Sequence, residues 1–332
     1  MIKDLILLGS TGSIGTSTLN VIRKNKANFK IKLLTTNKNV NKILSQAIEF
    51  NVKKVVVFDK NKFERFKSKF KKKRIKVFFT VNEALKNSRR KKAFFTISAI
   101  SGIEGLEPTL EVIKFTKNLG IANKESIICG WKFIHKELKK HKTNFIPLDS
   151  EHFSIWSLLK NENIKNINKI YLTASGGPFL NRKLNDIKNI KPKDALKHPN
   201  WKMGKKISID SATMMNKIFE IIEATKIFNL SSDSFKILIH PKSYVHAIIH
   251  FNNGLTKMLA HDTTMEIPIT NSLFRNNDTI VYSKKEFNFL RLNGENFIKP
   301  SKKKFPLLEI LNYKLKGTYF EVILVSLNDA LV

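Results

Sequence analysis

Acidic side chains are scarce in this sequence, with 27 Asp and Glu against 60 Lys and Arg, so their groupings are informative. Asp149 and Glu151 follow an expected strand, and their carboxylates could converge if that strand ends in a turn. Glu220 lies four residues after Asn216 and three after Lys217, which places Asn216 and Glu220 on one face of an expected helix. Three carboxylates without paired Cys or His favour a hard divalent ion, Mg²⁺ or Mn²⁺. A helix cap with an ordinary salt bridge fits the same spacing equally well.

A Ser-Gly-Gly-Pro sequence at residues 175–178 follows another expected strand and could bind an anion. Its hydroxyl and backbone N–H groups are the kind of donors that phosphate oxygens accept from. Together with Ser211, Asn216 and Lys217, this turn would form a phosphate pocket beside the metal. A simple Gly-Gly-Pro turn without a ligand is the alternative.

Residues 198–211 form one of the long polar segments, and their first half carries Trp201 and Met203. A surface loop does not normally expose two such large apolar side chains. A lid that closes over a substrate would account for them, and so would packing into the core. We expect residues 210–213 to cap the helix that carries the second acidic group.

A glycine-rich turn at residues 9–15 separates the first expected strand from the first expected helix. Such a turn lets the backbone approach a pyrophosphate, and the helix N-terminus adds N–H groups and partial positive charge. The spacing is GxxGxxG and not the usual GxGxxG, so a plain glycine-rich turn is the alternative. Residues 34–39, at the end of the second expected strand, contain Lys38 and no acid that would hold an NAD ribose hydroxyl. The missing carboxylate favours NADP.

The first 125 residues alternate short apolar runs with amphipathic segments. This pattern predicts a doubly wound parallel sheet of the α/β class, with ligands at the carboxyl ends of the strands. From about residue 144, single strands are separated by long segments rich in Gly, Pro, Ser and His, which predicts an α+β domain with mobile loops. We expect strands at residues 5–8, 31–34, 54–58, 75–78, 94–97, 120–122, 145–148, 170–173, 237–239 and 246–251, and helices at 17–24, 40–50, 63–70, 81–87 and from 123 onward.

The formal net charge of +33 is typical of proteins with a polyanionic partner. Lys, Asn, Ile and Phe are abundant together and the lysines are spread along the chain, which favours drift toward AT-rich codons over a nucleic-acid partner. The densest basic run, residues 71–74, is expected in a polar linker. Cys129 is the only cysteine, and no apolar run approaches the roughly 20 residues that span a bilayer. We therefore expect a cytoplasmic protein without a membrane partner.

These residues and their order resemble the 1-deoxy-D-xylulose 5-phosphate reductoisomerase family. The match is in register from Met1 to about Phe251 and is less clear beyond it. The combined set of motifs is highly specific, and it outweighs the alternatives for the single motifs. It consists of residues 9–15, Ala-Asn-Lys-Glu-Ser at 122–126, Pro-Leu-Asp-Ser-Glu-His at 147–152, Ser-Gly-Gly-Pro-Phe at 175–179, His-Pro-Asn-Trp at 198–201, Met-Gly at 203–204, and Asp-Ser-Ala-Thr-Met-Met-Asn-Lys at 210–217 with Glu220.

The resemblance implies an enzyme of the non-mevalonate isoprenoid pathway that rearranges 1-deoxy-D-xylulose 5-phosphate and reduces the resulting aldehyde with NADPH to 2-C-methyl-D-erythritol 4-phosphate. It also implies a Mg²⁺ or Mn²⁺ ion and a homodimer, and it places Trp201 and Met203 in a mobile flap. Carried over position by position, the metal ligands would be Asp149, Glu151 and Glu220, and the catalytic residues Lys124, Glu151 and His198. The substrate would contact Lys124, Ser150, Glu151, Ser175, His198, Ser211, Asn216, Lys217 and Glu220. NADPH would contact Thr11, Gly12, Ser13, Ile14, Lys38, Asn39, Asn123, Glu125 and Gly204.

The resemblance further implies three parts of the chain. Residues 1–145 would form a Rossmann-like NADPH-binding domain, residues 146–285 a catalytic α+β domain, and residues 286–332 a linker and the start of a helical domain. Family members continue beyond the segment that resembles residues 326–330, whereas this chain ends at Val332, so we expect a shortened enzyme whose helical domain is largely missing. A catalytically impaired remnant that still binds NADPH is the alternative, and a basic nucleic-acid-binding protein is a distant one.

Overall fold

The computed structural model describes residues 2–86, 91–185, 190–201, 203–274, 289–313 and 319–332. Contacts within the chain divide it into two compact units. The first unit comprises Met1–Asp149 with Pro268–Arg275, and the second comprises Ser150–Ile267 with Asn276–Val332. The expected boundary between residues 285 and 286 lies outside the described residues, and the described residues that follow it belong to the second unit.

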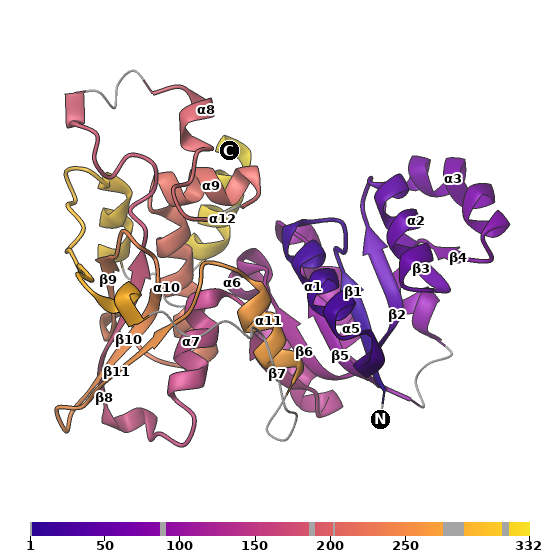
Figure 1. Cartoon of the computed structure of the whole chain (residues 1–332), viewed down its shortest axis with the longest axis horizontal. Coiled ribbons are helices and arrows are strands. Elements are labelled where there is room, and N and C mark those ends of the chain that lie inside the picture. The colour runs from indigo at the N-terminus through magenta and orange to yellow at the C-terminus, as the bar shows by residue number, and fades with distance from the viewer. Residues whose placement is uncertain (1, 87–90, 186–189, 202, 275–288, 314–318) are drawn as a thin grey trace. The chain divides into compact units, whose positions relative to one another are not determined.

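The first unit is built on a seven-stranded parallel sheet with the order β4-β3-β2-β1-β5-β6-β7. The strand order reverses beside β1, as in a doubly wound fold, so the predicted fold class is confirmed. Helices pack against this sheet (Figure 1). The strands are β1 (Lys3–Leu8), β2 (Phe29–Thr36), β3 (Lys54–Val57), β4 (Lys76–Phe78), β5 (Ala93–Ser98), β6 (Thr116–Ile121) and β7 (Asn144–Pro147), and the helices are α1 (Ser13–Lys24), α2 (Val40–Glu49), α3 (Lys60–Lys72), α4 (Val81–Leu85), α5 (Leu106–Ile113) and α6 (Lys124–His141).

The apolar runs of the central strands form the core of the first unit. Leu7 and Leu8 of β1 and Phe95 of β5 are buried. Both faces of a parallel sheet are covered by helices, so its strands are apolar on both sides and not alternating. This is why short apolar runs were sufficient to locate them in the sequence.

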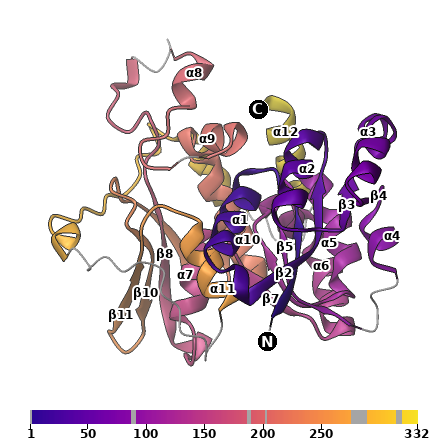
Figure 2. The same cartoon turned by 45° about the vertical axis from the view of Figure 1, so that its right-hand side comes forward.

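The second unit contains a mixed sheet with the order β11-β10-β8-β9, in which only β8 and β9 are parallel. Helix α7 packs on β10 and α10 on β8 (Figure 2). The edge strand β11 was not predicted, because its residues alternate between exposed and half-buried and include no long apolar run. The elements are β8 (Ile167–Ala174), β9 (Phe235–Ile239), β10 (Val245–Phe251), β11 (Thr256–Ala260), α7 (Ser150–Leu158), α8 (Pro192–Ala195), α9 (Lys205–Ala212), α10 (Met215–Phe228) and α12 (Phe320–Leu331), while α11 (Glu266–Leu273) crosses the division of the chain.

Two local predictions were wrong. Lys71 and Lys72 do not lie in a linker but in the last turn of α3, where cations interact favourably with the helix dipole. The segment 198–211 is not loop throughout, because its second half forms α9.

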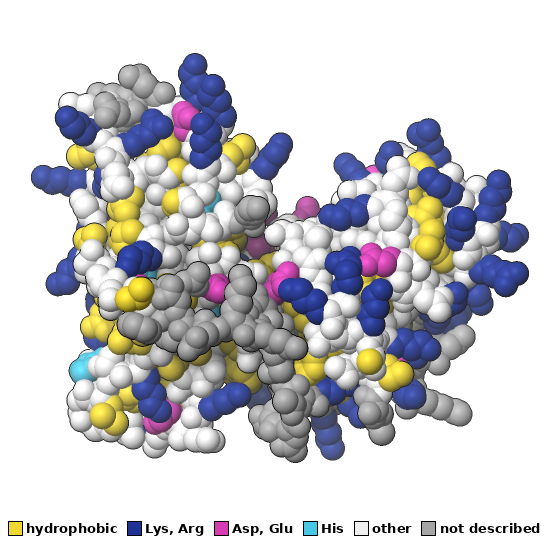
Figure 3. Space-filling view, in the orientation of Figure 1, with side chains coloured by type: hydrophobic (Ala, Val, Ile, Leu, Met, Phe, Trp, Pro, Cys, Tyr) yellow, Lys and Arg dark blue, Asp and Glu magenta, His cyan; other side chains and the backbone are white. Residues whose placement is uncertain are grey.

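Lysine and arginine side chains are scattered over the visible surface of both units (Figure 3). Among the described helices, none is long and apolar enough to cross a membrane.

Candidate active site

The three carboxylates that the sequence singled out come together. Asp149 immediately precedes α7, Glu151 lies in the first turn of α7, and Glu220 lies in the middle of α10. One carboxylate oxygen of each residue lies within 4.8 Å of the others. Their side chains are only 11%, 13% and 1% exposed, respectively, so water screens their mutual repulsion poorly. The cluster therefore needs cations, and carboxylate oxygens are the ligands that Mg²⁺ and Mn²⁺ prefer.

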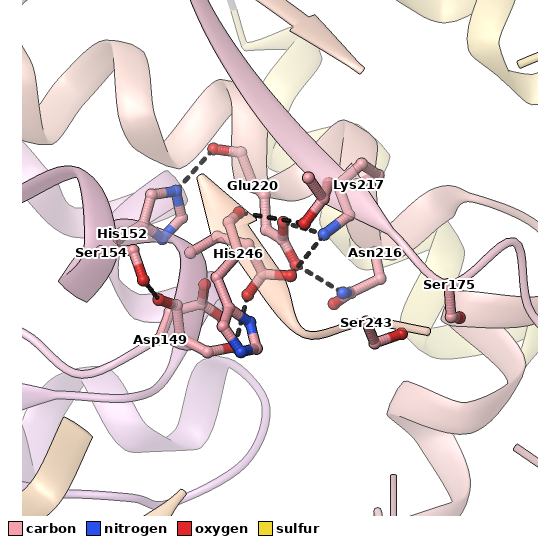
Figure 4. Close-up of polar contacts among 12 residues, drawn as sticks. Asp149, His152, Ser154, Ser175, Asn216, Lys217, Glu220, Ser243 and His246 are labelled. Atoms are coloured by element: carbon pink, nitrogen blue, oxygen red, sulfur yellow. Dashed lines mark hydrogen bonds and ion pairs between the residues drawn. The ribbon is translucent and has the colours of Figure 1, made fainter. Parts of the chain in front are cut away.

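Two lysines supply part of that positive charge. Lys217 Nζ lies 2.6 Å from Glu151 Oε1 and 2.6 Å from Glu220 Oε2 (Figure 4). Burial disfavours its charge, but the two carboxylates outweigh this effect and raise the pKa of Lys217. Lys124, in the first turn of α6, forms an ion pair with Asp149. Both ammonium groups thus pair with carboxylates of the group that could hold a divalent ion.

The predicted helical face is confirmed. Asn216 Nδ2 donates to Glu220 Oε1 over 2.6 Å, as the spacing of four residues requires (Figure 4). The predicted cap at 210–213 is wrong, however. Residues 210–212 end α9, Thr213 follows them, and α10 begins after Met214, which has a φ of 65° and makes no side-chain cap. The junction of α9 and α10 therefore lies between Ser211 and Asn216.

A buried pair behind the carboxylates was missed in the sequence. His152 Nδ1 lies 3.3 Å from Glu223 Oε2, and His152 Nε2 lies 2.9 Å from the backbone oxygen of Glu220. His152 follows Glu151 on α7, and Glu223 lies one turn after Glu220 on α10, so the pair joins the two helices that carry these carboxylates. The i, i+3 spacing of Glu220 and Glu223 was the available signal.

The Ser-Gly-Gly-Pro turn follows β8 and packs closely on the end of α9. Gly176 and Gly177 have φ angles of 85° and 68°, which favour glycine. A Cβ atom on Gly177 would lie 2.9 Å from the backbone oxygen of Ser211 and 3.0 Å from Ala212 Cα. The turn and Ser211 are therefore neighbours because residue 177 has no side chain.

His198 joins this turn to the loop that follows it. Its Nδ1 accepts from the backbone N–H groups of Asn200 and Trp201, over 3.2 and 2.9 Å. Burial and the charge of Lys217 lower the pKa of His198 to about 4, so the ring is neutral near pH 7. A neutral ring that accepts at Nδ1 carries its proton on Nε2. His198 Nε2 therefore donates to Ser175 Oγ, 2.9 Å away.

The loop 198–204 lies against the turn before β10. Asn200 Nδ2 donates to the oxygen of Pro241 over 2.6 Å and to Ser243 Oγ over 2.8 Å. The half-buried Trp201 ring meets the edge of His246, with centroids 5.8 Å apart. Met203 is also half-buried, and Lys202 lies outside the described residues. Trp201 thus packs against β10 within the second unit.

His246 in turn stacks on His261, with ring centroids 3.7 Å apart. Burial and the neighbouring His261 lower the pKa of His246 to about 4. Neutral rings stack without charge repulsion, so this pair is a stable support for Trp201 near pH 7.

In the first unit, the glycine-rich turn has the geometry of a dinucleotide site. Gly9, with a φ of 78°, follows β1, and its N–H donates to Thr35 Oγ1 at the end of β2. Helix α1 begins at Ser13 with Gly12 as its N-cap and without a side-chain cap, which leaves backbone donors for a ligand. Of the expected contacts, Thr11 and Gly12 lie in this turn, and Ser13 and Ile14 lie in the first turn of α1.

Other expected cofactor residues lie at the same edge of the sheet. Lys38 and Asn39 follow β2, and Asn39 is the N-cap of α2. Asn123 follows β6 as the N-cap of α6, and its amide donates to the oxygens of Ile100 and Gly102. Glu125 lies in the first turn of α6. Gly204, the N-cap of α9, belongs to the second unit.

Comparison with known proteins decides the family. A protein-family sequence model described as 1-deoxy-D-xylulose 5-phosphate reductoisomerase matches residues 5–130. A second family model, of the C-terminal domain of this reductoisomerase, matches residues 145–228. A Pelagibacter ubique protein named 1-deoxy-D-xylulose 5-phosphate reductoisomerase is 55% identical over 99% of this chain and 85% of its own length. The chain belongs to the 1-deoxy-D-xylulose 5-phosphate reductoisomerase family.

Solved structures of reductoisomerases agree with the fold. A DOX-P reductoisomerase in complex with NADPH, fosmidomycin and magnesium has a TM-score of 0.89 at 31% identity, over 99% of this chain and 85% of that one. The Zymomonas mobilis reductoisomerase in complex with NADPH has a TM-score of 0.83 at 31% identity, over 96% of this chain and 82% of that one.

Within the second unit of this reductoisomerase-family chain, the expected substrate residues form two neighbouring groups. Ser150, Glu151, Asn216, Lys217 and Glu220 form one, and Ser150 Oγ donates to Glu151 Oε2 over 2.5 Å. Ser175, His198 and Ser211 form the other, and the charge of Lys217 acts on His198 across the two. Sequence reasoning missed three residues that support this site, which are Glu223, Ser243 and His261.

Proposed function

We propose that this chain catalyses the NADPH- and divalent-metal-dependent rearrangement and reduction of 1-deoxy-D-xylulose 5-phosphate to 2-C-methyl-D-erythritol 4-phosphate, in isoprenoid precursor biosynthesis. The observation that carries this proposal is the carboxylate cluster of Asp149, Glu151 and Glu220 beside Lys217 and Asn216. Membership of the reductoisomerase family supports it.

We assign roles on this basis. Asp149, Glu151 and Glu220 hold the divalent ion, which when bound acts as a Lewis acid where negative charge develops on oxygen. Lys124, Glu151 and His198 are the catalytic residues, and Lys124 contacts the reacting end of the substrate. Bound NADPH supplies the hydride that reduces the aldehyde. Its contacts are Thr11, Gly12, Ser13, Ile14, Lys38, Asn39, Asn123, Glu125 and Gly204.

The substrate phosphate is bound away from the reacting atoms and supplies binding energy. Ser175, Ser211 and Asn216 donate hydrogen bonds to it, and Lys217 supplies charge. Because His198 and the Gly177 N–H both donate to Ser175 Oγ, the serine hydroxyl hydrogen is directed elsewhere and is available to a phosphate oxygen. Binding energy from the phosphate closes the loop 198–204 and excludes water from the reacting atoms.

A spectrophotometric assay tests the function. Purified protein with 1-deoxy-D-xylulose 5-phosphate and Mg²⁺ or Mn²⁺ should oxidise NADPH, and a chelator should stop the reaction until the ion is restored. E220Q should abolish turnover, whereas E309Q, at an exposed position, should not. No turnover by folded wild-type protein would contradict the proposal, and NADPH binding without metal-dependent turnover would instead indicate a protein that binds the cofactor without catalysis.

We further propose a homodimer, a cytoplasmic location, and residues 1–145 and 146–285 as the NADPH-binding and catalytic domains. The family resemblance supports the dimer, and the single cysteine is compatible with a reducing compartment. Light scattering at low micromolar concentration tests the dimer, and cell fractionation tests the location. Parallel titrations with Mg²⁺ and Mn²⁺ test which ion supports turnover.

A further inference from the structure

Two residues of α2, one helical turn apart, hold the glycine-rich turn. Gln46 Nε2 donates to the oxygen of Ser10 over 3.0 Å, and Gln46 Oε1 accepts from Ser10 Oγ over 2.8 Å. Lys42 Nζ donates to the oxygen of Thr11 over 2.8 Å and to Thr16 Oγ1 over 3.1 Å. Gln46 is buried, whereas Lys42 is exposed. Gln46 is therefore a structural clamp, and Lys42 presents a charged group to solvent from a fixed place on the turn.

Lys42 follows the end of β2, the part of a doubly wound fold that distinguishes its cofactors. The end of β2 and the start of α2 face the adenosine ribose, and a cation there accommodates the 2′-phosphate of NADP. Thr11 Oγ1 and Thr36 Oγ1 lie 2.8 Å apart, so the glycine-rich turn and the end of β2 are in contact at this point. The ammonium of Lys42 is bonded to the first of these two residues.

The hydrogen bonds of the Lys42 ammonium group also leave a donor for an anion. An ammonium has three N–H donors, and Thr11 and Thr16 accept from two of them, so one remains for a ligand. The side chain of the neighbouring Asn39 has a capping role, because its oxygen accepts from the backbone N–H of Lys42 over 3.3 Å. A lysine that is already held in place loses less side-chain entropy on binding than a freely moving one.

We propose that Lys42 is a specificity-determining residue that donates to the 2′-phosphate of NADPH. The inference rests on the proposed NADPH-dependent function and adds to it a residue of α2 that the sequence motifs did not include. Lys42 discriminates NADPH from NADH, while its bond to Thr11 keeps the ammonium beside the ribose.

Direct binding tests this without turnover. Dissociation constants for NADPH, NADH, 2′,5′-ADP and 5′-AMP are measured by calorimetry for wild type, K42Q, K42R and the control K136Q, which alters an exposed residue of α6. K42Q should weaken NADPH and 2′,5′-ADP about 10- to 100-fold, the loss of a hydrogen bond between charged groups. It should leave NADH and 5′-AMP within about twofold, since they lack the phosphate. K42R should restore much of the affinity, and K136Q should behave as wild type.

Three outcomes overturn the inference. Equal weakening of NADPH and NADH by K42Q would show that Lys42 only shapes the turn, and unchanged NADPH affinity would show that it makes no contact. Wild-type protein that binds NADPH no better than NADH would overturn the proposed cofactor preference as well. Wild-type protein that prefers NADPH but does not turn over substrate would defeat the proposed function alone. Circular dichroism of each variant shows that it is folded.

Discussion

Ser175 Oγ lies 2.9 Å from Nε2 of His198, and this contact joins the proposed phosphate turn to the loop that bears Trp201. The same histidine accepts from the backbone of Asn200 and Trp201 through its other ring nitrogen. The neutral His198 ring thus orients the Ser175 hydroxyl through one nitrogen and holds the backbone of the loop through the other. The position of the loop is therefore coupled to the turn that would grip the phosphate.

The variant S175A tests the grip on the phosphate. The lost hydroxyl removes one hydrogen bond to a charged group, and we expect the KM for 1-deoxy-D-xylulose 5-phosphate to rise about 10- to 100-fold, with a smaller change in kcat. Steady-state kinetics at saturating NADPH measure it. S326A, on the exposed part of α12, is the matched control. A KM equal to that of wild type would show that Ser175 does not bind the phosphate.

The low pKa of His198 predicts a dependence of stability on pH. The folded-state pKa of about 4 lies below the ordinary value of 6.5. Between these values the unfolded chain binds the proton and the folded chain does not, so stability is lost as pH falls from about 6.5 toward 4. His246 acts in the same window. Urea unfolding at several pH values should show this loss.

Replacement of His198 shows how much this residue contributes to the pH dependence of stability. In H198Q, the decrease in the free energy of unfolding between pH 7 and pH 5 should be smaller than in wild type, because one of the histidines with a lowered pKa is gone. H250Q, which removes a half-buried histidine of β10 that bonds to Thr256, serves as the control. An unaltered pH dependence in H198Q would contradict the assignment of this half-buried histidine as neutral.

Gly15 makes the close approach of α1 to the glycine-rich turn possible. An added Cβ would lie 2.3 Å from the oxygen of Gly9 and 2.6 Å from the carbonyl carbon of Ser10, and backbone atoms cannot move aside cheaply. We expect G15A to lower the free energy of unfolding by about 1–3 kcal/mol and to weaken NADPH binding. In the matched variant G12A, the added Cβ would meet only the oxygen of Gly9, at 3.5 Å. Thermal denaturation should therefore show a clear loss of stability for G15A and little for G12A.

The buried contact between His152 and Glu223 predicts an effect on metal binding by residues that are not ligands. E223A removes the partner of His152 and should lower the free energy of unfolding by about 1–3 kcal/mol. Because the pair joins the helices that carry Glu151 and Glu220, Mn²⁺ affinity should fall about tenfold or more. Titration of Mn²⁺ followed by electron paramagnetic resonance measures this affinity. E223Q keeps the size and a hydrogen-bonding oxygen and should recover part of it, and an unchanged affinity in E223A would limit the pair to a structural role.

Local sequence patterns were sufficient for the parallel sheet, the glycine-rich turn and the helical face of α10. Each depends on residues close together in the chain. The apolar run of β1 followed by residues 9–15 indicates a strand, a turn and a helix start, and the spacing of Asn216 and Glu220 sets them side by side on any helix. The carboxylates were found because acids are rare here, which made three of them in two motifs conspicuous against 60 basic residues.

Tertiary structure decided which partners these residues have. Lys217 binds Glu151, 66 residues earlier, and His152 reaches Glu223 only because α7 and α10 pack together. The position of Ser211 at the end of α9, and not in a cap, follows from the left-handed conformation of Met214. The place of Lys42 on the turn follows from the packing of α2 against β2, the strand that pairs with β1. The spacing of residues along the chain determines which side chains are neighbours within one helix or strand. Contacts between helices and strands depend on how their buried faces pack, and this packing cannot be read from the order of residues in one sequence.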